Sequence, residues 1–143
     1  MWAVLTGILS GALMSIQGVF NTQITRQTGL WVAAGWAQLT AFLVCAVAWL
    51  ITGRQAMGNL WSVDHRYMLT AGLIGAGITI TVVKSIGGMG PAKATMLILT
   101  AQLVMSYIIQ VSGMFGVEKQ PFMWRKLAAV CVIIGGIIFF QWE

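Results

Sequence analysis

Residues 1–25 read MWAVLTGILSGALMSIQGVFNTQIT and contain no Asp, Glu, Lys or Arg, and Arg26 ends the stretch. Charged side chains are costly in hydrocarbon, and a helix needs roughly 20 mostly apolar residues to cross a bilayer. The stretch is therefore long enough for one membrane crossing. It is too long for the apolar part of a signal peptide and lacks the basic segment such a peptide begins with, so we expect an uncleaved helix.

Four more uncharged stretches follow along the chain, over residues 27–53, 67–83, 94–117 and 127–142. Two of these are short for a crossing, but Lys84 and Lys126 can extend their stems to the headgroups and lengthen the spans. We therefore predict an all-α integral membrane protein with five transmembrane helices in a single domain, residues 1–143. The expected helix limits are about 2–21, 31–52, 67–87, 92–112 and 122–141.

The composition excludes several classes of protein. Apolar residues make up 59% of the chain and charged residues 8%, whereas a soluble domain carries about 25% charged residues. This excludes an ordinary cytosolic enzyme, a disordered segment and a nucleic-acid-binding module. The formal charge is +5, but the eight Lys and Arg residues are spread along the whole chain. They are typical of membrane-flanking anchors and not of a phosphate-binding patch, so no nucleic acid partner is expected.

The chain offers no catalytic or metal-binding constellation. Cys45 and Cys131 both lie in apolar stretches, and His65 is the single histidine. A disulfide scaffold or a metal site would need more thiols or imidazoles at ligand spacing. His65 has no identifiable Ser or Cys nucleophile. We expect neither an enzyme nor a cofactor nor a metal.

An odd number of crossings places the two termini on opposite sides of the membrane. With the N-terminus in the cytoplasm, five Lys and Arg residues lie inside and three outside, a weak bias that leaves insertion in both orientations open. Two odd-helix units in opposite orientations form an inverted repeat, the architecture of many secondary transporters. We therefore expect an antiparallel dimer of the chain with itself or with a sister chain.

Small residues recur at the spacing that brings membrane helices close together. In lipid, close backbone approach at such residues carries much of helix association. The helix-packing candidates are Gly7 and Gly11, Gly72 and Gly75, and Gly135 and Gly136.

Polar side chains inside the spans need a partner or a wet cavity. Gln17 and Asn21 are four residues apart and share a helix face, and a second polar stripe repeats at the same spacing further along the chain. The alternative is hydrogen bonding between helices that holds the bundle together. Trp36 lies inside the second span, either as a packing residue or in the pocket. The substrate-pocket candidates are Gln17, Asn21, Gln38, Gln102, Ser106 and Gln110.

No carboxylate lies inside any predicted span, because Asp64, Glu118 and Glu143 fall in connectors or at the end. This disfavours simple antiport of protons against cations. Lys84 and Lys93 flank a Gly-rich connector and could attract an anionic group, or they could serve only as anchors at helix ends.

Several short motifs together resemble a known family. They are SIQGVFNTQ at 15–23, GLIGA at 72–76, MGPA at 89–92, AQLVMS at 101–106, GMFG at 113–116 and WRKL at 124–127. Over nearly the whole chain the sequence resembles the YdcZ-like short five-helix family of the drug/metabolite transporter superfamily.

The resemblance implies a multi-pass protein of the bacterial plasma (inner) membrane, a drug/metabolite-transporter-like half unit that works as an antiparallel pair. It names no cargo. Carried onto matching positions, it makes Gln17, Asn21 and Gln102 the best pocket candidates. Relatives often carry an acid where this chain has Gln110. If that acid couples transport to protons in the family, this chain must couple transport in another way or rely on a partner chain.

The leading hypothesis is a secondary transporter subunit for a small polar solute, working by alternating access across the dimer. The alternatives are a non-transporting membrane scaffold or partner subunit, and a passive channel. A carrier would show saturable exchange, and a channel would show uncoupled conductance.

Overall fold

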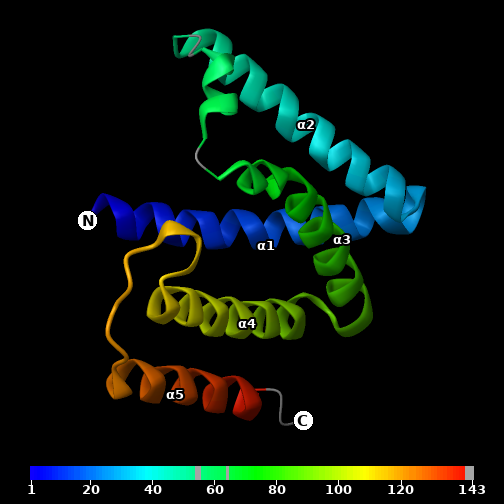
Figure 1. Ribbon diagram of the computed structural model, residues 1–143. Coiled ribbons are helices and arrows are strands. Elements are labelled where there is room, and N and C mark those ends of the chain that lie inside the picture. The colour runs from blue at the N-terminus through cyan, green and yellow to red at the C-terminus, as the bar shows by residue number, and fades with distance from the viewer. Residues whose placement is uncertain (54–55, 64, 141–143) are drawn as a thin grey trace. The chain divides into compact units, whose positions relative to one another are not determined.

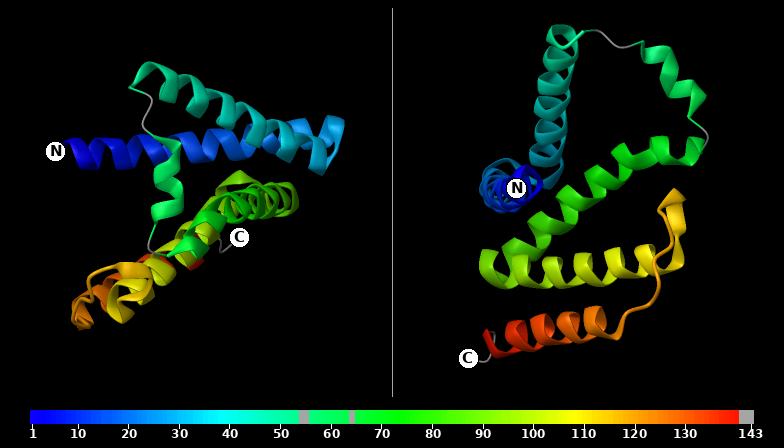
Figure 2. Two further views of the ribbon diagram at one scale, coloured as in Figure 1. Left: turned by 45° about the horizontal axis from the view of Figure 1, so that its top comes forward. Right: turned by 90° about the vertical axis from the view of Figure 1, so that its left-hand side faces the viewer.

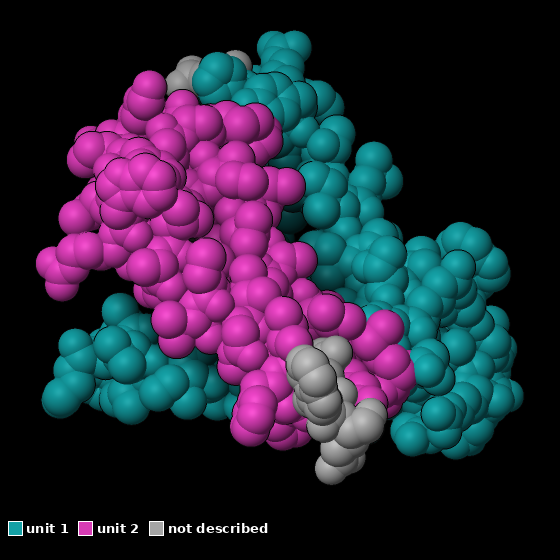
Figure 3. All heavy atoms as spheres, turned by 90° about the horizontal axis from the view of Figure 1, so that it is seen from below, with its two compact units in different colours: residues 1–88 teal, residues 89–143 magenta. Residues whose placement is uncertain are grey.

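The computed structural model describes residues 1–53, 56–63 and 65–140, and this part of the chain is helical without a strand. The helices of the described part are α1 (Trp2–Thr28), α2 (Leu30–Ile51), η1 (Met57–Ser62), η2 (Arg66–Thr70), α3 (Ala71–Met89), α4 (Pro91–Ser112), η3 (Met114–Gly116) and α5 (Trp124–Phe140) (Figure 1). The chain divides into two compact units, Met1–Gly88 and Met89–Glu143 (Figure 3).

Helix α1 corrects the expected limit of 2–21, because it continues to Thr28. The residues after position 21 are polar, but their side chains do not break the helix. The hydroxyl of Thr22 donates to the carbonyl of Gly18 at 2.7 Å, and that of Thr28 to the carbonyl of Ile24 at 2.9 Å. The helix ends at Gly29, whose φ of 94° suits glycine and strains other residues.

The other limits lie closer to expectation. Helices α2 and α4 begin one residue before the expected 31 and 92. Helix α3 begins at Ala71 and not at 67, because Arg66–Thr70 forms the 3-10 helix η2, and it ends at Met89. Helix α5 begins at Trp124 and not at 122. Of the expected connector between the second and third spans, residues 54, 55 and 64 lie outside the described residues, as do 141–143.

In the first unit, α1 and α2 form a hairpin that turns at Gly29 and opens away from the turn (Figures 1 and 2). Ala33 and Ala34, just after the turn, are buried, with exposed fractions of 1% and 6%. Their short side chains allow the two helices to lie close together there. The spacing between the helices then widens toward Trp2 and Ile51, so a groove opens between them.

Helix α3 packs on α1 at Gly18. A Cβ atom at Gly18 would lie 2.7 Å from Cδ1 of Ile86 and 3.2 Å from Cγ1 of Val82. A side chain at this position would therefore have to displace the ends of the Ile86 and Val82 side chains, and glycine avoids that displacement. Val83 and Ile86 of α3 are among the few buried apolar side chains of the described residues.

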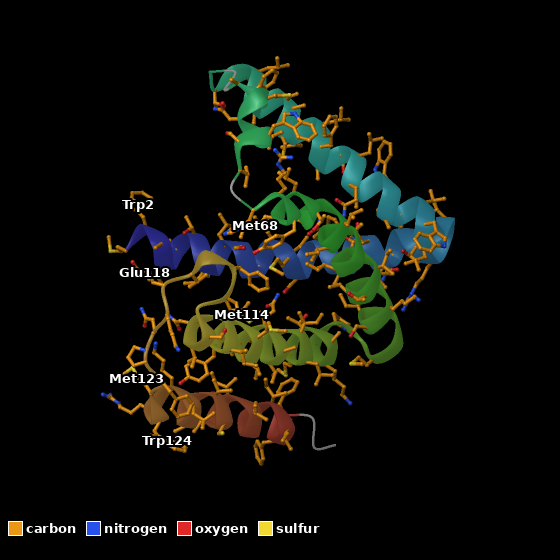
Figure 4. All side chains as sticks on the ribbon, viewed as in Figure 1. Trp2, Met68, Met114, Glu118, Met123 and Trp124 are labelled. Carbon is orange, nitrogen blue, oxygen red and sulfur yellow. The ribbon has the colours of Figure 1, made fainter. Side chains whose placement is uncertain are left out.

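In the second unit, α4 ends at Gly113, which adopts a left-handed conformation with φ 71°. The chain then passes through η3 and an extended segment before α5 begins (Figure 4, from Met114 to Trp124). Tyr107 of α4 holds the start of α5. Its hydroxyl accepts a hydrogen bond from the backbone N–H of Met123 at 3.1 Å and donates to the Met123 carbonyl at 3.2 Å.

Four segments of the described chain are long and apolar enough to cross a membrane: Trp2–Thr28, Leu30–Ile51, Arg66–Met89 and Pro91–Ser112. Their large apolar side chains are mostly exposed, and a protein in water would bury them. These features agree with the expected membrane protein. Helix α5 has 17 described residues, at about the lower limit for a crossing, so the fifth span stays a prediction, as does the single domain.

Candidate functional site

A groove of about 600 Å³ lies between α1 and α2, within the size range of small-molecule sites. Helix α1 lines it with Leu13, Ile16, Gln17, Phe20, Asn21 and Ile24, and α2 lines it with Trp36, Ala37, Thr40, Ala41, Val44 and Cys45. We call this cavity the α1–α2 groove. Its walls are mainly apolar, with two carboxamides and a hydroxyl among them, which is the usual pattern of a ligand site.

Gln17 and Asn21 lie together in the groove because they are one turn apart on α1. Asn21 is 8% exposed, and its carboxamide makes no hydrogen bond within the described part of the chain. A carboxamide offers two donors and one acceptor, and the described chain uses none of those of Asn21. The amide atoms of Asn21 are not fully buried, so they stay accessible to a molecule in the groove.

A second polar group without a partner lies one turn further along α1. The hydroxyl oxygen of Thr25 is buried and makes no hydrogen bond with the described residues. The spacing 17, 21, 25 could have identified Thr25 from the sequence. The prediction missed it because the expected helix ended at residue 21, before Thr25.

The α2 wall supplies an aromatic face and a hydroxyl. Trp36 lines the groove and is 58% exposed, and its role in a pocket stays a prediction. The hydroxyl of Thr40 donates to the carbonyl of Trp36 at 2.9 Å, and its oxygen remains able to accept. Cys45 lines one end of the groove and also borders a second, apolar groove of about 540 Å³ formed with η1.

Gln38 does not line the α1–α2 groove. Its Nε2 donates a hydrogen bond of 3.1 Å to the hydroxyl of Thr79 on α3. The structure thus places Gln38 in a contact between helices, which was the alternative interpretation for polar residues in the spans.

The polar stripe of Gln102, Ser106 and Gln110 lies on α4, in the second unit. There α4 meets α5 across an apolar groove of about 380 Å³, to which Val104 and Ile108 contribute. At about 100° per residue, Gln102 and Ser106 lie on nearly the opposite side of α4. No side chain of the stripe has a hydrogen bond within the described residues, and Gln102 and Ser106 are exposed. The packing of α4 on α5 therefore does not use the side chains of this polar stripe.

The two candidate anion-attracting lysines lie in different units. Lys84 is exposed on α3, and Lys93 is exposed in the first turn of α4. Their role toward an anion stays a prediction.

The expected helix-packing glycines are open within the described chain. No atom lies within 4 Å of a Cβ placed at Gly7, Gly11, Gly72, Gly75, Gly135 or Gly136. Their packing role stays a prediction. The glycines that the structure places in close contacts include Gly18, against Ile86, and Gly113, where a Cβ would lie 3.0 Å from Cβ of Lys119.

A family model described as "Putative inner membrane exporter, YdcZ" matches residues 2–139. No match was found among curated proteins or among solved structures.

Proposed function

Because the chain belongs to the YdcZ family of inner-membrane exporters, we propose that it exports a small molecule as one half of a paired transporter. The family is one of membrane exporters and not of enzymes, and its place is the inner membrane. In the proposal α5 is the fifth crossing. Two chains of the drug/metabolite transporter type, identical or sister, then assemble in opposite orientations, and the lipid bilayer surrounds them.

The observation that carries the proposal is the carboxamide of Asn21, which lines the α1–α2 groove and makes no hydrogen bond within the described residues. Its donors and its acceptor are therefore available to a solute that enters the groove. Gln17 lies one turn away and can hold a second group of the solute.

In the proposed mechanism the solute binds near the middle of the membrane, and one chain rocks against the other to expose it to the outside. The α1–α2 groove and the free stripe of Gln102, Ser106 and Gln110 line the path of the solute in the assembled transporter. The groove contains no carboxylate, so the proposed coupling does not use a proton-binding acid there.

Reconstituted vesicles test the proposal. We expect saturable export of a small solute from a panel of metabolites, and the variant Asn21→Leu is expected to lower its rate about tenfold, the loss expected for one or two hydrogen bonds. The matched control is Gln23→Leu, which makes the same change on the same helix at an exposed position outside the groove. A scaffold would export nothing, and a channel would show conductance without saturation. Either result would contradict the proposal.

A further inference from the structure

The α1–α2 groove contains no charged side chain. Its polar groups are the carboxamides of Gln17 and Asn21, the hydroxyl of Thr40 and the indole N–H of Trp36. The nearest cation along α1 is Arg26, and it is not among the lining residues. An ion taken from water into such a site would give up part of its hydration and find no opposite charge among the lining residues. The charge pattern therefore favours an uncharged solute.

The shape and chemistry of the walls specify the solute further. Phe20 and Trp36 present aromatic surface from the two helices, which suits a flat apolar body. Asn21 presents both donors and an acceptor from a site that is 8% exposed. A carboxamide on the solute can match it with two antiparallel N–H···O hydrogen bonds, one in each direction.

We propose that the α1–α2 groove binds an uncharged solute with a flat apolar body and a carboxamide or similar donor–acceptor group, which pairs with the buried carboxamide of Asn21. The inference rests on the proposed export function, because it names the substrate class of that same groove. The strongest competitor is an organic cation held on the face of Trp36, since indole rings attract cations.

Cys45 provides a reporter inside the groove, because it is exposed and lies among the lining residues. For the experiment, the variant Cys131→Ser is prepared, which leaves Cys45 as the single thiol. The variant is then reconstituted in liposomes. The rate of alkylation by N-ethylmaleimide is then measured with three probes that share one ring: indole-3-acetamide (neutral), tryptamine (cationic) and indole-3-acetate (anionic).

We expect indole-3-acetamide to slow alkylation of Cys45 at concentrations about tenfold below those at which either charged probe does so. In Asn21→Leu the concentration of indole-3-acetamide needed is expected to rise about tenfold, and in Gln23→Leu to stay unchanged. Because Cys45 also borders the groove formed with η1, the effect of Asn21→Leu shows which of the two grooves is occupied.

Four outcomes would overturn the inference. A charged probe could protect Cys45 as well as indole-3-acetamide, or protection could persist in Asn21→Leu. The third outcome is that none of the three probes protects Cys45 from alkylation, which is expected if lipid chains fill the groove. Finally, Cys45 could react only after the assembly is dissociated, which would make the groove a contact between chains.

The two proposals fail in different ways. Export of some solute without protection by indole-3-acetamide would overturn the substrate class and leave the exporter in place. Protection that depends on Asn21, without export of any solute in the panel, would overturn the exporter and leave the binding site in place.

Discussion

Gln38 of α2 donates a hydrogen bond from Nε2 to the hydroxyl oxygen of Thr79 on α3, and the two atoms are 3.1 Å apart. Thr79 in turn donates to the carbonyl of Gly75 on its own helix. The hydroxyl is therefore used in both directions, and α2 is joined to α3. Gln38 therefore has a hydrogen-bond partner on a neighbouring helix, whereas the carboxamide of Asn21 has none within the described residues.

A double-mutant cycle measures this hydrogen bond. We expect Gln38→Leu and Thr79→Val to be coupled by about 0.6 kcal/mol, the average for such bonds in membrane proteins. The measurement is the free energy of unfolding in detergent. Thr81→Val serves as the control, because within the described residues the hydroxyl of Thr81 bonds only to carbonyls of its own helix. Equal coupling of Gln38 with Thr81 would show that the structure has misplaced the bond.

Gly18 is expected to be intolerant of side chains. In Gly18→Val the new Cβ would lie 2.7 Å from Cδ1 of Ile86, so the Ile86 side chain must leave its rotamer or α1 and α3 must separate, at a cost of about 1–3 kcal/mol. Gly35→Val on α2 makes the same change where no atom lies within 4 Å of the new Cβ. Thermal unfolding of the two variants gives the difference. Similar melting temperatures would count against the contact between α1 and α3.

Tyr107→Phe is expected to loosen the start of α5 by about 1 kcal/mol, because it removes the hydrogen-bond partner of the Met123 N–H. The Met123 carbonyl keeps its bond from the N–H of Lys126. Hydrogen exchange at Met123 and thermal unfolding measure the effect. Tyr67→Phe is the matched control, since its hydroxyl has no hydrogen bond within the described residues. An unchanged exchange rate at Met123 would contradict the prediction.

Thr25→Val is expected to stabilise the protein without ligand by about 1 kcal/mol, because it replaces a buried hydroxyl that has no partner with a methyl group of the same shape. Thr28→Val is the control, and we expect no gain there because the Thr28 hydroxyl bonds to the Ile24 carbonyl and is exposed. Melting temperatures in detergent compare the two. A loss of stability in Thr25→Val would mean that its hydroxyl has a partner in the assembled protein.

Antiparallel pairing predicts which ends of α5 meet. If the last helices of two chains lie against one another, Lys126→Cys in one chain should cross-link to Ile138→Cys in the other, when the two variants are mixed. A parallel pair would instead join Lys126→Cys to itself. Reporter tags fused to the two termini supply the second measurement, and we expect them in different compartments, because the proposal has five crossings.

The helices and the membrane were predictable from the sequence because both depend on local properties. A helix satisfies its own backbone hydrogen bonds, and a long run without charges is stable in hydrocarbon. The same reasoning failed at residues 22–28, where polar composition suggested a connector. Thr22 and Thr28 bond back to their own helix, so the polar side chains there do not end α1.

The sequence by itself determined that the chain forms apolar helices in a membrane, and that Gln17 and Asn21 share one face of the first helix. Only the tertiary structure decided that Asn21 lines a groove without a hydrogen bond to the described residues, that Gln38 is bound to Thr79, and that Gly18 meets Ile86. The physical reason is that spacing along a helix specifies which residues share a face. What that face contacts depends on how the next helix crosses it, and side chains distant in the sequence set that crossing.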